Sequence, residues 1–222
     1  MKFIDEIKAR AKQDVKTIVL PESRDKRTLI AAAQVLKEGT AKIVMVGDEE
    51  KIRDGAHWLD VELDGISVVN PETSPKLDEY VNLLYELRKK KGITPERARE
   101  ILLQANYFGT MLVKMGIADA LLGGATYSTA DTVRPALQLI KTKPENNIVS
   151  SCFILVRPSA TGENEVLAMA DCAINIEPNE DELVEIAGEA AECAKIFGVD
   201  PQIAFLSYST HGSGKSDAVD KM

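Results

Sequence analysis

Short apolar runs alternate with longer segments of helical periodicity along the whole chain. Seven runs have the length and composition of β-strands, and several are apolar at nearly every position. They cover residues 16–22, 42–49, 66–72, 118–124, 148–156, 165–173 and 202–209. A strand that is apolar throughout is buried on both faces, and helical segments connect these runs. The pattern therefore predicts an α/β fold rather than an antiparallel β fold.

The pattern changes near Asn147. The polar segment KTKPENN is followed by two strand-like runs joined by the turn-rich SATGENE, which is typical of a β-hairpin. We therefore predict an N-terminal α/β domain over residues 1–147 and the beginning of a second α/β domain over 148–222. The run at 202–209 is followed by only the start of a helix, so the second domain is expected to be incomplete in this chain.

Composition and charge narrow the classes of function. The formal net charge of −8 disfavours nucleic acid as a partner, because binding to the phosphate backbone needs a basic surface. No run approaches the roughly 18 apolar residues of a membrane span, and the start MKFIDEIKAR lacks the apolar core of a secretory signal. Three cysteines without CxxC spacing indicate free thiols rather than disulfides or a zinc site. We expect a cytoplasmic protein.

One arginine occupies an unusual place in the segment 74–92. This segment is predicted to be a helix that has Ser74 as its N-cap, Pro75 at its first position and Gly92 at its end. The expected buried stripe consists of Leu77, Val81 and Leu84. Arg88 continues this stripe by one further turn. Cations at the C-terminus of a helix interact favourably with its dipole, which explains the neighbouring lysines but explains Arg88 less well. A role of Arg88 in anion binding and a structural role both remain open.

A glycine-containing turn precedes another arginine. Gly123 and Gly124 end a strand-like run, and Ser128 with Asp131 fits a capping box at the start of a helix. The N–H groups at such a helix start can bind an anion, and Arg134 lies about two turns further on. Taken alone this signal is weak, because a tight turn with a surface arginine has the same pattern.

The last strand-like run leads into a loop rich in hydroxyl and glycine residues, which is able to surround an anion with donors. Its candidate binding residues are Ser207, Ser209, Thr210, Gly212, Ser213 and Gly214. The end of the loop, GSGKS, is similar to a Walker A motif, but Ser209 stands where that motif needs glycine. A nucleotide-binding loop is therefore the less favoured alternative. His211 lies inside the loop and could titrate near a phosphate.

Five sequence blocks resemble, in order, blocks of the phosphate acetyltransferase family, which also includes phosphate butyryltransferases. The blocks are TIVLPESRDKRTLIAAA, VMVGDEE, YELRKKKGIT, GGATYSTADTVRPALQLIKT and FLSYSTHGSGKSD. The resemblance covers essentially the whole chain. It implies a two-domain α/β/α fold related to isocitrate dehydrogenases, a homodimer, and an active site in the cleft between the domains. It also implies acetyl phosphate, phosphate and coenzyme A as ligands, with no metal and no cofactor besides coenzyme A as substrate.

The resemblance also assigns residues. Arg88 and Arg134 correspond to two arginines that the family uses around its acyl phosphate and coenzyme A, so we expect both to be catalytic. Ser128, Thr132 and the hydroxyl-rich loop are expected to bind substrate. The chain departs from many relatives at His211 and Gly214, where they have lysine and alanine, and in the segment 127–130. These departures leave the details of substrate recognition open.

A C-terminal segment of the family, with a Ser-Arg pair and an aspartate that deprotonates coenzyme A, has no counterpart in this sequence. The resemblance therefore implies that the 222-residue chain is catalytically incompetent by itself. Two alternatives to an acetyltransferase remain. One is a phosphate butyryltransferase, which differs in its acyl pocket. The other is a non-catalytic acetyl-CoA-binding domain like that of some malic enzymes, which we disfavour because the chain begins at the start of the fold.

Overall fold

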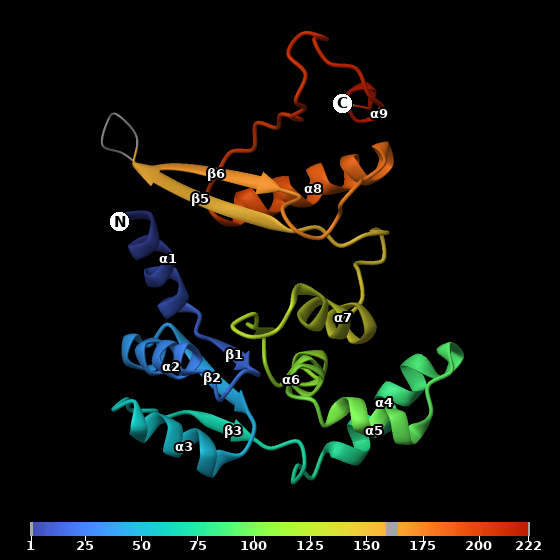
Figure 1. Cartoon of the computed structure of the whole chain (residues 1–222). Helices are drawn as coiled ribbons and strands as arrows, with labels where there is room; N and C mark the ends of the chain where they lie inside the picture. The colour runs from blue at the N-terminus through green and yellow to red at the C-terminus, as the bar shows by residue number, and fades with distance from the viewer. Residues whose placement is uncertain (1, 159–163, 222) are drawn as a thin grey trace. The chain divides into compact units, whose positions relative to one another are not determined.

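The computed structural model describes residues 2–158 and 164–221. Its helices and strands alternate from α1 to β3, and three helices follow before the next strand (Figure 1). They are α1 (Lys2–Gln13), β1 (Lys16–Leu20), α2 (Lys26–Glu38), β2 (Ala41–Val46), α3 (Glu49–Trp58), β3 (Ser67–Val69), α4 (Leu77–Arg88), a 3-10 turn (Lys89–Lys91), α5 (Pro95–Leu102), α6 (Ala105–Lys114), β4 (Ala120–Leu121), α7 (Thr129–Leu139), β5 (Cys152–Pro158), β6 (Asn164–Ala170), α8 (Glu180–Ile196) and α9 (Asp217–Asp220).

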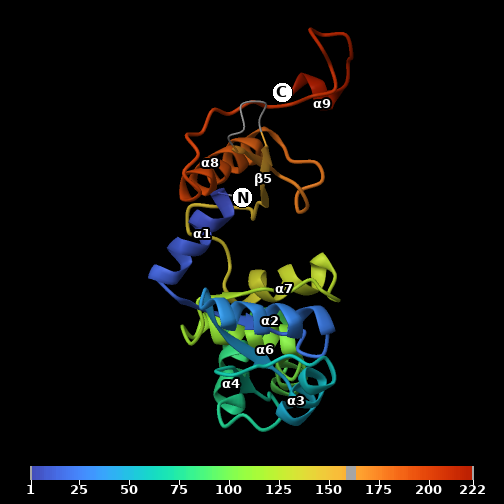
Figure 2. The same ribbon diagram turned by 90° about the vertical axis from the view of Figure 1, so that its left-hand side faces the viewer.

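The chain forms two compact units, Lys8–Lys141 and a second made of Met1–Ile7 with Thr142–Met222. The first unit holds a parallel sheet in the order β3-β2-β1-β4. Helices α2 and α3 cover one face of this sheet, while α4, α5, α6 and α7 lie on the other side (Figures 1 and 2). The α/β prediction is confirmed.

Consecutive residues of the same strand point to opposite faces of this sheet. On β1, Val19 belongs to the core beneath α4 to α7, while Leu20 belongs to the core beneath α2 and α3. On β2, Val44 and Val46 face the first core, whereas Met45 faces the second. Burial on both faces is the reason why these strands are apolar at nearly every position.

Helix α4 differs from its prediction at one end. It begins at Leu77 rather than at Pro75, because Ser74 makes a local turn in which its hydroxyl accepts a hydrogen bond from the Lys76 N–H at 3.3 Å. The helix ends at Arg88, and the 3-10 turn continues to Gly92, whose φ of 81° is the left-handed conformation that ends helices. The predicted buried stripe is confirmed, and Arg88 is half-buried where the stripe ends.

The second unit contains the predicted hairpin. Strands β5 and β6 pair in antiparallel register, with Cys152 opposite Ala170 and Phe153 opposite Met169. The predicted turn between them lies largely outside the described residues. Helix α8 packs against the hairpin, and the rings of Phe3 and Phe197 lie 6.4 Å apart in the same unit. Besides residues 1–7, the unit contains the chain from Thr142 onward, which is six positions before the domain start predicted from the sequence.

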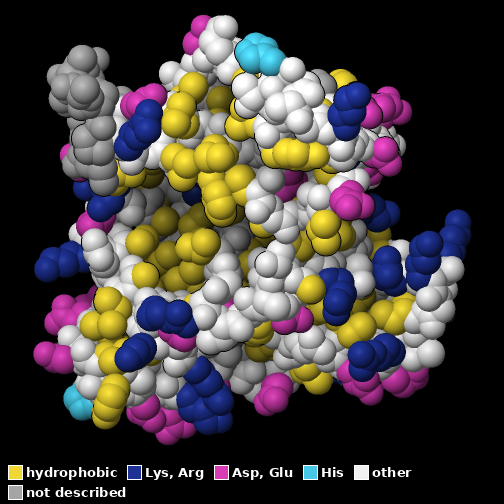
Figure 3. All heavy atoms as spheres, turned by 45° about the horizontal axis from the view of Figure 1, so that its top comes forward, with side chains coloured by type: hydrophobic (Ala, Val, Ile, Leu, Met, Phe, Trp, Pro, Cys, Tyr) yellow, Lys and Arg dark blue, Asp and Glu magenta, His cyan; other side chains and the backbone are white. Residues whose placement is uncertain are grey.

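One face of the hairpin is apolar and exposed, and surface hydrophobic side chains are visible in Figure 3. Its cross-strand pairs are Phe153 with Met169 and Leu155 with Leu167. All four side chains are more than 40% exposed, while the residues between them, Ile154 and Ala168, are half-buried.

The strand predicted at residues 202–209 is wrong for this structure. The segment makes no ladder, because no described strand pairs with it. Ile203, Phe205 and Leu206 consequently remain about half or more exposed. A strand-like sequence becomes a strand only where a neighbour takes its N–H and C=O groups. Among the described residues, no helix is long and apolar enough to cross a membrane.

Candidate functional site

Two arginines from different helices line one cavity of about 420 Å³ in the unit formed by residues 8–141. Arg88 is the last residue of α4, and Arg134 lies on α7. We call this space the arginine cavity. Its lining consists of Arg88, Lys91, Gly92, Ile93, Arg97, Ile101, Gln104, Tyr107, Arg134 and Gln138. The two arginines that the sequence singled out thus face one space, as expected if they bind one anion.

The cations of the arginine cavity are mostly without an acidic partner. Arg97 pairs with Glu100 at 2.7 Å. In the described part of the chain, no carboxylate forms an ion pair with Arg88, Lys91 or Arg134. Several unpaired cations around one cavity create a local positive potential although the chain as a whole is acidic. The cavity is therefore suited to an anion with more than one charge, which a guanidinium can bind through two parallel hydrogen bonds.

A buried tyrosine forms the inner wall of the cavity. Tyr107 is 7% exposed, and its hydroxyl donates a hydrogen bond of 3.1 Å to Oε1 of Gln138. Burial raises the pKa of Tyr107, while the nearby positive charges of Arg134, Arg88 and Arg97 oppose that rise. The hydroxyl is therefore protonated at neutral pH and available as a donor. Sequence reasoning missed Tyr107, Gln138, Lys91 and Arg97 as members of this cavity.

The start of α7 is confirmed as a capping box. The Ser128 hydroxyl accepts a hydrogen bond from the Asp131 N–H at 3.2 Å, and the Asp131 carboxylate accepts from the Ser128 N–H at 3.3 Å. Thr132 donates its hydroxyl proton to the Ser128 carbonyl at 3.2 Å. Both hydroxyls that we expect to bind substrate thus serve the helix start, and their substrate role stays a prediction.

A carboxylate of the chain itself occupies the glycine-containing turn that precedes α7. Glu22 accepts hydrogen bonds from the backbone N–H groups of Gly124, Ala125, Thr126 and Tyr127, two of them at 2.7 Å. Burial opposes ionisation of Glu22, but these hydrogen bonds outweigh it and lower its pKa to about 2. Glu22 thus occupies the N–H groups of the turn. The N–H groups at the start of α7, where the sequence predicts an anion site, are different groups, and their role stays a prediction.

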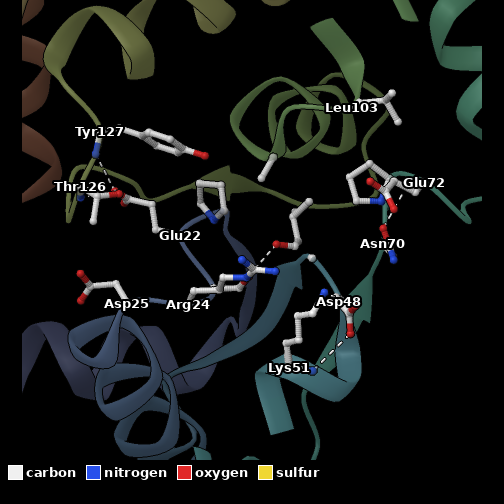
Figure 4. Close-up of a pocket in the computed structure, with 16 residues that line it drawn as sticks. Glu22, Arg24, Asp25, Asp48, Lys51, Asn70, Glu72, Leu103, Thr126 and Tyr127 are labelled. Carbon is white, nitrogen blue, oxygen red and sulfur yellow. Dashed lines mark hydrogen bonds and ion pairs between the residues drawn. The ribbon is translucent and has the colours of Figure 1, made fainter. Parts of the chain in front are cut away.

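A second cavity, of about 560 Å³, lies at the carboxyl ends of β1, β2 and β3, which is where α/β folds commonly bind ligands (Figure 4). The polar side chains at its wall include Arg24, Asp48, Lys51, Asn70 and Glu72. Lys51 pairs with Asp48 at 3.1 Å. Acidic groups balance the cations here, so this cavity is less suited to a phosphate than the arginine cavity. The sequence signal that could have located it is the polar residue that follows each strand.

The hydroxyl-rich loop belongs to the unit that includes residues 142–222, and its relation to the arginine cavity stays a prediction. The Ser209 hydroxyl accepts from the Gly214 N–H at 3.0 Å, and the Ser213 hydroxyl accepts from the Thr210 N–H at 3.1 Å. Gly212 has a φ of 74°, which favours glycine. The loop is thus closed by its own side chains. The substrate roles of Ser207, Ser209, Thr210, Gly212 and Ser213 remain predictions.

Comparison with known proteins identifies the family of the chain. Residues 2–222 match the family described as Phosphate acetyl/butaryl transferase. The chain belongs to this family. It is 46% identical to a phosphate acetyltransferase of Acetivibrio thermocellus and 47% identical to one of Thermoanaerobacterium thermosaccharolyticum. Each alignment covers 100% of this chain, and 67% and 68% of these two family members respectively.

A solved structure of the family is also similar. The phosphotransacetylase from Streptococcus pyogenes superposes with a TM-score of 0.89 at 43% identity, over 99% of this chain and 66% of that one. The chain thus spans about two thirds of the length of these family members. The resemblance stated from the sequence blocks is confirmed.

Proposed function

We propose that this chain carries the phosphate-binding part of a phosphate acetyltransferase, which transfers an acetyl group between acetyl phosphate and coenzyme A. The observation that carries the proposal is the pair Arg88 and Arg134, which line one cavity and form no ion pair with a carboxylate among the described residues. Membership of the family, and the names of its similar members, support the same reaction.

In the proposed reaction, the thiolate of coenzyme A attacks the carbonyl carbon of acetyl phosphate. A new C–S bond forms, the C–O bond to phosphate breaks, and acetyl-CoA and inorganic phosphate are released. Arg88 and Arg134 stabilise the negative charge on the phosphoryl group and on the departing phosphate. Ser128, Thr132 and the loop 207–214 complete the substrate site. The thiol proton passes to a general base that the resemblance places beyond these 222 residues.

We further propose that the reaction needs neither a metal nor a resident cofactor, since thiolate attack on an activated acyl group requires none. Rates with and without a chelator would test this. A cytoplasmic location accords with the three cysteines, all of which are free in the structure. The homodimer implied by the family resemblance is to be tested by light scattering.

The function is tested by acetyl-CoA formation from acetyl phosphate, with butyryl phosphate as the competing substrate. Two proteins are compared: the 222-residue chain, and a chimera that continues with the part of the Acetivibrio thermocellus relative not covered by the alignment. We expect the chain alone to be at least 10²-fold slower, because general-base catalysis is worth about 10²–10⁴-fold. A folded chimera that transfers neither acyl group would contradict the proposal, and a preference for butyryl phosphate would favour the butyryltransferase.

A further inference from the structure

Gln138 lies in the arginine cavity one helical turn beyond Arg134. Both residues belong to α7, and a spacing of four places their side chains on the same face of the helix. Both line the cavity together with Arg88 of α4. Gln138 is half-buried, and it is the one residue of the cavity to which the buried hydroxyl of Tyr107 is bonded.

The hydrogen bond from Tyr107 decides which end of the Gln138 amide is free. An amide side chain has one oxygen acceptor and one NH₂ group with two donors. The Tyr107 hydroxyl donates its proton to Oε1 at 3.1 Å, so the oxygen is engaged. No acceptor among the residues described takes a proton from Nε2. The free end of this side chain is therefore a donor, beside cations that also have only donors to offer.

The surrounding contacts keep this arrangement in place. Next to Tyr107 on α6, the buried Asn106 donates from Nδ2 to the carbonyl of Asp131 on α7 at 2.7 Å. Two side chains of α6 thus hold α7 at two places about two turns apart. Tyr107 itself is surrounded by the core of this unit and has little freedom to move. The rotation of α7, and with it the direction of Arg134 and Gln138, is set by these bonds.

We propose that Gln138 is a ligand-binding residue of the arginine cavity, donating from Nε2 to an oxygen of the bound phosphoryl group, and that Tyr107 is the residue that positions its amide. A neutral donor adds a directed hydrogen bond without adding charge. The two arginines supply most of the attraction, while Gln138 selects the orientation of the phosphoryl group. This inference rests on the proposed function, because it takes the phosphoryl group as the occupant of the cavity.

The test measures binding of inorganic phosphate and of acetyl phosphate to the whole chain by calorimetry or NMR titration. Q138L removes the donor while preserving most of the volume, and we expect it to weaken binding about 3- to 10-fold. Q138E places a carboxylate beside the anion and should weaken binding more than Q138L. Y107F keeps the ring. It should weaken phosphate binding at least twofold, but by no more than Q138L does. Y85F, a tyrosine of α4 that does not line the cavity, is the matched control.

A double-mutant cycle separates positioning from a purely structural role. If Tyr107 acts through Gln138, the double variant Y107F/Q138L binds phosphate no more weakly than Q138L. Independent losses that multiply would contradict the positioning of Gln138 by Tyr107. Variants that lower the melting temperature but leave phosphate affinity unchanged would overturn the whole inference. If the wild-type chain binds neither inorganic phosphate nor acetyl phosphate, the proposed occupant of the cavity is wrong, and not only the proposed roles of Tyr107 and Gln138.

Discussion

The hydroxyl of Thr126 donates a hydrogen bond of 2.7 Å to the carboxylate of Glu22, although 104 positions separate the two residues in the sequence. The same carboxylate accepts from the backbone of Gly124–Tyr127. Arg27, held by Asp25 at 2.8 Å, also donates to the carbonyl of Ala125. Hydrogen bonds thus join the segment 21–27 to the segment 123–128, and the second segment leads directly into the helix that carries Arg134.

Replacing Glu22 with Gln should destabilise the fold in a pH-dependent way. The pKa of Glu22 is about 2, against an ordinary value of 4.5. Its ionised form therefore stabilises the fold above about pH 4.5, and this contribution is lost as the pH falls towards 2. We expect Glu22→Gln to lower the free energy of unfolding by about 1–3 kcal/mol at pH 7.

Urea unfolding at pH 7 and at about pH 3 would measure this effect, with Glu62→Gln at an exposed site as the control. The difference between wild type and Glu22→Gln should shrink at the lower pH. An equal difference at both values would mean that the charge of Glu22 is not what holds the loop.

Removing either arginine of the cavity should weaken phosphate binding strongly. A charge-assisted hydrogen bond contributes about 1.5–3 kcal/mol, so Arg88→Ala and Arg134→Ala should each weaken affinity for inorganic phosphate by about 10- to 100-fold. Lysine at either position should restore part of the affinity, since it keeps the charge but not the forked geometry.

Lys90→Ala is the matched control for the arginine variants, because Lys90 is an exposed neighbour of Arg88 that does not line the cavity. An equally large loss of phosphate affinity in Lys90→Ala would show that net charge, rather than the cavity, governs binding. Raising the salt concentration should weaken binding to the wild type more than to the arginine variants.

The loop at 207–214 should not hydrolyse ATP. The Ser209 hydroxyl closes this loop on Gly214, at a position where a Walker A motif requires glycine, and residues 201–206, directly before the loop, do not form a strand. We expect no magnesium-dependent release of phosphate from ATP above background. Turnover that disappears in Lys215→Ala would contradict this assignment.

Cys152 should react slowly with alkylating reagents at neutral pH. Burial raises the pKa of its thiol to about 11, and the neighbouring thiols of Cys193 and Cys172 act in the same direction. Because the thiolate is the nucleophile, modification by iodoacetamide should accelerate about tenfold per pH unit between pH 8 and 10. Peptide mapping by mass spectrometry would follow this position, and fast labelling at pH 7 would count against the raised pKa.

Local pattern was sufficient for the central sheet. The first three strand-like runs became β1, β2 and β3, and β1 and β2 are apolar enough to be buried on both faces. The capping box at Ser128 and the helix end at Gly92 could also be predicted, since these depend on neighbouring residues alone. Arg88 stood out in the sequence because a cation interrupted an apolar stripe.

Tertiary structure decided what these residues meet. The pattern at 202–209 is strand-like, but a ladder needs a partner strand, and no described strand supplies one. The sequence does not show that the N–H groups of Gly124–Tyr127 have an anion of their own, and only the fold brings Glu22 to them. Likewise, Tyr107 and Gln138 carry no local sign of their pairing. The sequence by itself determines the helices and turns whose hydrogen bonds and caps are made between neighbouring residues. Contacts between residues that are distant along the chain are decided only when the helices and strands pack together.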